Sequence, residues 1–191
     1  MRNNVLHCTI MGLLTIGYSA VMLAQAGSGY ARPMVPQLLE KMGHRVAVET
    51  QRPKGAHDFR ISWHSAKGQP NAPSSEQMQF VERIERNNPP PRQRSSEISK
   101  DDLVVIVLDQ QGTVRYWRII VDPRLVRGEF PDDHGNLHNY TFYRTDVTLE
   151  VSVPDTIDAA EVRVLSPSWD STGALRLSPV GAVKLPPGPL Q

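Results

Sequence analysis

The stretch Asp102–Asp122 reads DLVVIVLDQQGTVRYWRIIVD. Two apolar, β-branched runs in it flank the polar connection Asp109–Gly112. Aspartate at the first position of a four-residue turn and glycine at the fourth are typical of a type I turn, so the stretch predicts a β-hairpin. Leu103–Leu108 shows no alternation of apolar and polar residues. Such a run is typical of a strand covered on both faces, and we expect it at the centre of the fold.

Two further segments have the alternation of half-buried strands. In Asp58–His64 and in Val147–Val153 every second residue is apolar. Between them, Asp122–Glu129 is expected to be irregular or an edge segment, and Asp132–Asn136 is expected to be a turn. Because about seven short strands follow one another with little helical pattern between them, the sequence predicts an all-β fold, an antiparallel two-sheet β-sandwich.

The β pattern is interrupted over residues 65–101. A stripe of apolar residues at helical spacing predicts a short helix in this insertion; its members are Met78, Val81 and Ile84. Glu82 and Arg86 lie four residues apart, where they would pair on a helix surface. Three prolines in Asn87–Pro91 would end the helix. We therefore expect a helical and Pro-rich insertion between strands of the sandwich.

The N-terminal residues 1–26 have the features of a cleaved signal peptide. Ile10–Ala24 is mostly apolar and uncharged. Ala24 and Ala26 occupy the −3 and −1 positions before a cleavage point after Ala26, where signal peptides have small residues. The alternative is an uncleaved membrane anchor. The apolar stretch is short for this role, because a helix that crosses a membrane needs roughly 20 apolar residues. Cys8, the only cysteine, falls inside this segment, so we expect no disulfide in the exported chain.

The remaining chain divides by composition. Residues 27–43 are expected to be a flexible lead-in with a short helical turn, which begins near Pro36 and ends at Gly43. Residues 44–185 would form the sandwich, and residues 186–191 a Pro-rich tail. Without Arg2, 20 of the 21 Lys and Arg residues remain, against 20 Asp and Glu. This balance does not favour nucleic acid as a partner.

One segment resembles a known family. The run Val147–Pro167 consists of a predicted strand, a Pro-Asp turn and a second predicted strand. This arrangement is similar to the late strands of immunoglobulin-like and fibronectin type III-like modules in bacterial secreted proteins. The resemblance extends over Val46–Leu185 without the insertion and concerns the architecture. It implies a β-sandwich module, and it implies no particular function, since such folds carry many.

The residues give no sign of catalysis. No Gly-x-Ser-x-Gly nucleophile elbow lies between a strand and a helix, and no phosphate-binding glycine loop is present. We therefore expect neither an enzyme nor a cofactor. The alternative is a copper or zinc site in the turn segment, because imidazole and carboxylate groups suit these metals; its ligands would be His134, His138 and Asp133.

Arginines around the central hairpin favour a binding surface. The guanidinium group of arginine suits contacts with carboxylate groups. Aromatic residues lie between these arginines in the sequence. The predicted binding residues are Tyr116, Arg118, Arg124 and Arg127. The alternative is a solvated strand face with cation–π contacts.

The sequence as a whole thus favours an exported, non-catalytic β-sandwich module, periplasmic or extracellular, that binds another envelope protein or a surface polymer. A small periplasmic copper- or zinc-binding protein and an accessory domain of a secreted hydrolase are the alternatives.

Overall fold

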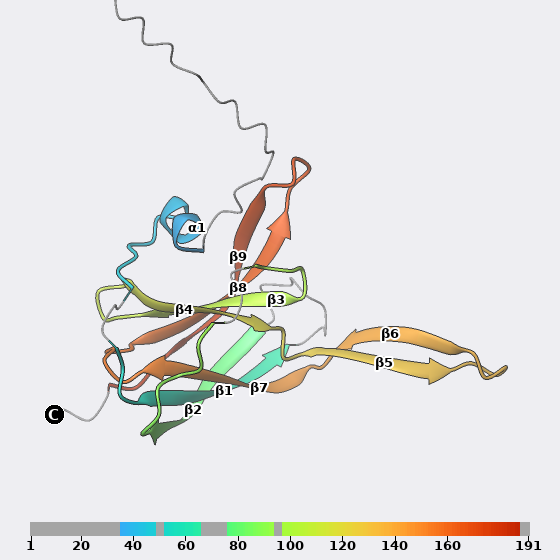
Figure 1. The fold of residues 1–191 in the computed structure, drawn as a ribbon, viewed down its shortest axis with the longest axis horizontal. Coiled ribbons are helices and arrows are strands. Elements are labelled where there is room, and N and C mark those ends of the chain that lie inside the picture. Colours follow the sequence, from blue (N-terminus) through green and yellow to red (C-terminus); the bar gives the residue numbers. More distant parts are fainter. Residues whose placement is uncertain (1–34, 49–51, 66–75, 94–96, 188–191) are drawn as a thin grey trace, which may run out of the picture. The chain divides into compact units, whose positions relative to one another are not determined.

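The structure is a computed structural model that describes residues 35–48, 52–65, 76–93 and 97–187 (Figure 1). The predicted signal peptide over residues 1–26 lies outside the described residues, and so does the first part of the predicted lead-in. In the described ranges the chain forms one helix and nine strands. In chain order they are α1 (Val35–Lys41), β1 (Ala56–Ser65), β2 (Glu76–Arg86), β3 (Asp102–Leu108), β4 (Val114–Val121), β5 (Leu125–Pro131), β6 (Leu137–Tyr143), β7 (Asp146–Pro154), β8 (Glu161–Trp169) and β9 (Leu175–Lys184).

The described strands form three antiparallel sheets (Figure 1). One has the order β2-β1-β7, the second the order β4-β3-β8-β9, and the third consists of β5 and β6 alone. The chain passes from the three-stranded to the four-stranded sheet after β2, returns to the three-stranded sheet at β7 by way of the β5–β6 sheet, and enters the four-stranded sheet again at β8. Seven strands therefore make up the two larger sheets, which confirms the predicted all-β sandwich. The β5–β6 sheet is additional, and its residues were expected to be partly irregular.

The main hydrophobic core lies between the two larger sheets. Alternate side chains of β1 and β7 enter it from one sheet, and alternate side chains of β3 and β8 enter it from the other together with Val180 and Val183 of β9. This alternation follows from the two-residue period of a strand. The core members from the two strands with the clearest alternation are Phe59, Ile61, Trp63, Leu149, Val151 and Val153.

A second core covers the opposite face of the four-stranded sheet. The other three side chains of β3, Val104, Ile106 and Leu108, pack in one cluster with residues of α1. All six residues of Leu103–Leu108 are at most 2% exposed. The predicted strand covered on both faces is thus confirmed, and α1 supplies part of the second cover. The predicted helical turn before Gly43 is confirmed as well, with a left-handed φ of 86° at that glycine.

Three hairpins share one turn sequence, Asp-x-x-Gly. In the central one, the Gly112 amide donates to the Asp109 carbonyl at 3.0 Å, and the Asp109 carboxylate accepts from the Thr113 amide at 2.9 Å. Gly112 has a φ of 76°, which a glycine adopts without the steric cost of a Cβ. The turns at Asp132 and Asp170 repeat these bonds. The predicted central hairpin is therefore confirmed together with its turn.

The predicted helix in the insertion is wrong. Residues 76–86 form β2, which pairs with β1 along its whole length. Ile61 pairs with Phe80 and Arg60 with Glu82, which leaves Val81 as an extra residue on β2. Such a β-bulge reverses which residues of the strand point inward. Met78 on the core face, the bulged Val81 and Ile84, which pairs with Asp58, therefore fall three residues apart, and this spacing imitates a helix although the three side chains do not share a face.

The contacts of β2 follow this strand geometry. Met78 packs against the main core, whereas Val81 is 56% exposed. The ion pair predicted between Glu82 and Arg86 is absent, because each side chain pairs with β1 instead. Glu82 binds Arg60, and Arg86 binds the buried Asp58.

Candidate functional site

The β5–β6 sheet is a two-stranded ribbon with one aromatic face. Directly paired residues share a face of an antiparallel pair, and the pairs on this face are Val126–Phe142, Gly128–Tyr140 and Phe130–His138. We call the side chains of these residues the aromatic face. Its three phenylalanine and tyrosine rings are exposed to solvent: Phe130 is 51% exposed, Tyr140 53% and Phe142 48%.

Gly128 allows the rings of this face to close over the backbone. A Cβ at this position would lie 2.9 Å from Cε2 of Phe130, so the ring covers the glycine. Phe130 meets Tyr140 edge-to-face, with 5.6 Å between the ring centroids and 71° between the planes. Aromatic rings that cover a glycine stabilise a strand at that position. The aromatic face is thus an ordered surface rather than a set of separate exposed side chains.

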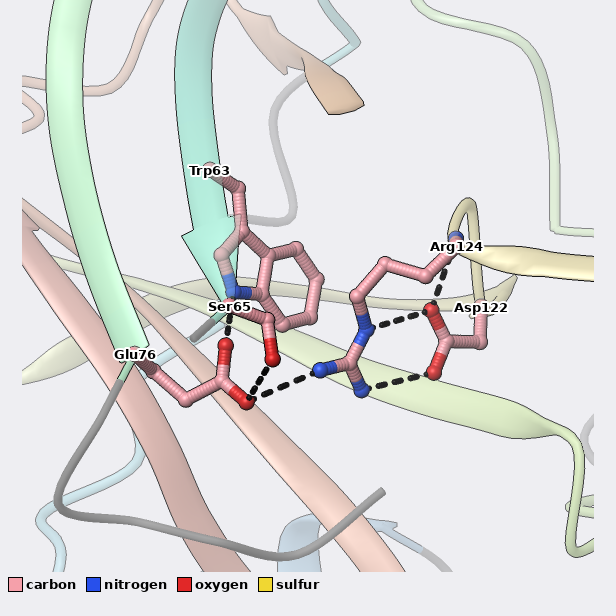
Figure 2. A network of polar contacts seen from close by, with 5 residues as sticks. All are labelled: Trp63, Ser65, Glu76, Asp122 and Arg124. Atoms are coloured by element: carbon pink, nitrogen blue, oxygen red, sulfur yellow. Dashed lines mark hydrogen bonds and ion pairs between the residues drawn. The ribbon is translucent and has the colours of Figure 1, made fainter. Parts of the chain in front are cut away.

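The base of the ribbon holds a buried arginine (Figure 2). Arg124 follows the Asp122-Pro123 step between β4 and β5, and its side chain is 1% exposed. Its Nε donates to Oδ1 of Asp122 at 3.1 Å, and its Nη2 donates to Oδ2 at 2.8 Å. Its Nη1 donates to Oε1 of Glu76, at the start of β2, at 3.0 Å. The guanidinium therefore joins two carboxylates from distant parts of the chain.

The remaining atoms of this network are also satisfied (Figure 2). Ser65 Oγ donates to Oε1 of Glu76 at 2.9 Å, and Trp63 Nε1 donates to Oε2. The Arg124 guanidinium carbon lies 4.1 Å from the centroid of a Trp63 ring, in a cation–π contact. The backbone of Arg124 in turn accepts a hydrogen bond from Arg144, which follows β6. The network thus fastens both strands of the ribbon to the ends of β1 and β2.

The four predicted binding residues lie in different settings, and Arg118 is half-buried on β4, where its side chain is hydrogen-bonded to that of Tyr116. Arg124 is inside the protein, so the predicted contact of its side chain with a ligand is not supported by its position. Arg127 is exposed on the ribbon face opposite to the aromatic face and forms an ion pair with Asp101. Tyr116 packs against the main core, and its burial raises the pKa of its phenol, although the neighbouring Arg118 acts in the opposite direction.

The turn that joins β5 and β6 contains the predicted metal ligands. Asp132 Oδ1 accepts from the amides of His134 and Asn136, and Asp132 Oδ2 lies 3.0 Å from Nε2 of His138. The structure thus brings together His138 and Asp132, not the predicted set with Asp133. Over the described ranges, no three His, Asp or Glu side chains are grouped as a metal site would need. We therefore do not propose a metal site.

The Asp132 carboxyl gives a pH-dependent prediction for the ribbon. Hydrogen bonds from His138 first, and then from Asn136, lower its pKa from 3.8 to about 2. Because the folded-state pKa is depressed, this contribution to stability is complete above the unfolded value of 3.8 and is lost as the pH falls through about 2. In an NMR titration, the amide signals of His134 and Asn136 should shift with a midpoint near 2, and His138→Ala should raise that midpoint.

The control for this titration is Asp132→Asn, which keeps an oxygen for the turn but cannot titrate. The low-pH transition should then vanish from both amide signals. A midpoint near 4 in the unaltered protein would show that the carboxylate is not held by these hydrogen bonds.

The aromatic face was missed by the sequence-based prediction, although a signal exists. His138, Tyr140 and Phe142 alternate with polar residues, which is the two-residue period of a strand. That pattern indicates a strand with one apolar face but not whether anything covers this face. The burial of Arg124 could not be read from the local sequence, because only its partner Asp122 is near in the chain and its other carboxylate partner, Glu76, is 48 residues away.

Comparison of the chain with protein-family models, curated proteins and solved structures gave no match. The resemblance to immunoglobulin-like and fibronectin type III-like modules therefore stays a prediction. No helix in the described part of the chain is long and apolar enough to cross a membrane.

Proposed function

We propose that this chain is a non-catalytic binding module of the bacterial envelope that holds a protein partner on the aromatic face of the β5–β6 ribbon. The observation that carries the proposal is the exposure of Phe130, Tyr140 and Phe142 on a sheet that, among the described strands, has no third member. Contiguous exposed apolar surface commonly marks an interaction site. Aromatic residues are also enriched at protein interfaces.

The ribbon offers a partner two kinds of contact. The rings can act as anchors that lose their exposure when a partner covers them. The backbone at the outer edges of β5 and β6 is not paired with another described strand, so an extended partner segment can add there as a further strand. An isolated two-stranded hairpin is at best marginally stable, and a partner that buries one face would stabilise it.

The ribbon base supports this role physically. Arg124 and its carboxylates fix the point at which both ribbon strands leave the sandwich. A contact surface that is ordered before binding costs less conformational entropy when the complex forms. The buried network would therefore act as a support for the binding face rather than as a part of it.

Export to the envelope is part of the proposal and rests on the sequence. The apolar stretch Ile10–Ala24 and the alanines that follow it favour a signal peptide. Mass spectrometry of the protein from the native envelope should give a chain that begins at Gly27.

The binding proposal is tested by a double substitution, Tyr140→Ser with Phe142→Ser. Complexes are cross-linked in the native envelope, purified through the tagged chain and quantified by mass spectrometry. The partner recovered with the unaltered chain should fall at least tenfold, because the substitution removes two central anchors, each worth about 2 kcal/mol or more at a typical interface. Analytical ultracentrifugation of the purified chain tells self-association from binding to another protein.

The matched control is Leu137→Ser. This side chain is 65% exposed on the same strand, but it points to the opposite face of the ribbon. Recovery of the partner should therefore be unchanged. Equal recovery with the double substitution and with the unaltered chain, while both stay folded, would rule out the aromatic face as the binding surface.

A further inference from the structure

The outer face of the three-stranded sheet carries polar side chains in register. Side chains at paired positions form rows across the strands. Two successive rows, in the order β2, β1 and β7, are Gln77–His64–Asp146 and Gln79–Ser62–Thr148. These six residues line a groove of about 650 Å³ together with residues beside the ribbon base, which include Pro123 and Arg144. The groove is separate from the aromatic face and uses none of its residues.

Among the described residues that line this groove, the one carboxylate, that of Asp146, already has partners within the protein. Asp146 Oδ1 lies 2.6 Å from Nδ1 of His64, and its Oδ2 accepts from Thr145 Oγ1 at 2.8 Å. These hydrogen bonds lower the pKa of Asp146 below its ordinary value, and the bond with His64 contributes most. The carboxylate therefore stays ionised and paired. Asp146 therefore keeps its negative charge, but both of its oxygens already accept hydrogen bonds from within the protein.

Several other groups in the groove have no partner in the described part of the chain. The guanidinium of the exposed Arg144 forms no ion pair with any described residue. Gln77, Gln79 and Thr148 make no side-chain hydrogen bond with described residues. The groove thus combines the positive charge of Arg144, unpaired among the described residues, with the hydrogen-bonded carboxylate of Asp146 and with neutral amide and hydroxyl groups, which both donate and accept.

We propose that this groove binds an oligosaccharide that carries carboxylate groups. The Arg144 fork would bind a carboxylate through two parallel hydrogen bonds. The glutamine amides and the Thr148 hydroxyl would bind sugar hydroxyls, which also both donate and accept. A peptide is less suited, because it is usually held through backbone hydrogen bonds at a strand edge. The rows of this groove lie on the face of the sheet, where the strands present side chains.

The test is calorimetric titration with a short oligogalacturonate and with its methyl ester. The acidic form should bind, and the ester should bind at least tenfold more weakly because it lacks the charge. Arg144→Gln should weaken binding of the acidic form about tenfold or more, as expected for loss of a charge-assisted hydrogen bond. Gln79→Ala with Thr148→Ala should weaken binding of both forms.

The matched control is Arg176→Gln, which removes an exposed positive charge from β9, outside the groove. It should leave the affinity unchanged. The proposal is overturned if oligogalacturonate does not bind, if its methyl ester binds equally well, or if Arg144→Gln has no effect in a folded protein. Equal binding of oligoglutamate would assign the groove to anions in general and would also overturn it. The double substitution on the aromatic face should bind the saccharide normally, so the two proposals fail independently.

Discussion

Replacing Arg124 with methionine is expected to lower the free energy of unfolding by about 3–5 kcal/mol, the usual loss when one member of a buried ion pair is removed. The carboxylates of Asp122 and Glu76, with side chains 6% and 1% exposed, would remain buried without their cation. The contact with Trp63 would keep only its apolar part. Urea unfolding followed by tryptophan fluorescence measures the loss directly.

Two further variants separate burial of charge from loss of packing. Asp122→Asn with Glu76→Gln, added to Arg124→Met, removes the uncompensated charges and should recover much of the stability. Arg176→Met removes an arginine from an exposed pair with Asp170 and should cost only a small fraction of the loss. A loss at Arg124 as small as that at Arg176 would show that solvent reaches the two carboxylates in the folded protein.

The centre of the sandwich could be predicted from the sequence because its signals are local. The run Leu103–Leu108 is apolar throughout, so only a strand covered on both faces could bury it. The turn after it is specified by Asp109 and Gly112 within four residues. Both features depend on neighbours in the chain, and neither requires knowledge of the tertiary structure.

β2 could not be recognised because its pattern changes within the strand. The extra residue Val81 shifts the inward-facing positions by one, so no single period fits the whole segment. The pairing with β1 that defines the bulge is a tertiary contact. It involves charged partners, such as Arg60 with Glu82, whose alignment the sequence alone does not reveal.

The candidate site was harder to predict than the fold for the same reason. Arg124 has the sequence context of an exposed arginine, and besides its pair with the nearby Asp122 its buried setting includes the distant residues Glu76 and Trp63. The aromatic face depends on the register that places Tyr140 opposite Gly128. The polar groove likewise combines side chains of β1 and β2 with those of β7, which lies far from them in the chain. Sequence patterns identified strands here, whereas the chemistry of each surface came from their alignment.

Leu39→Ala is expected to lower the free energy of unfolding by about 2–5 kcal/mol, the range measured for buried leucines. Leu39 is fully buried in the cluster that α1 forms with β3, so truncation leaves a cavity over the central strand. Chemical denaturation gives the magnitude, and Met42→Ala is the control. Met42 lies just beyond the same helix and is 39% exposed, so its truncation should change stability by less than about 0.5 kcal/mol. Equal effects of the two substitutions would mean that α1 is not required to cover the sheet.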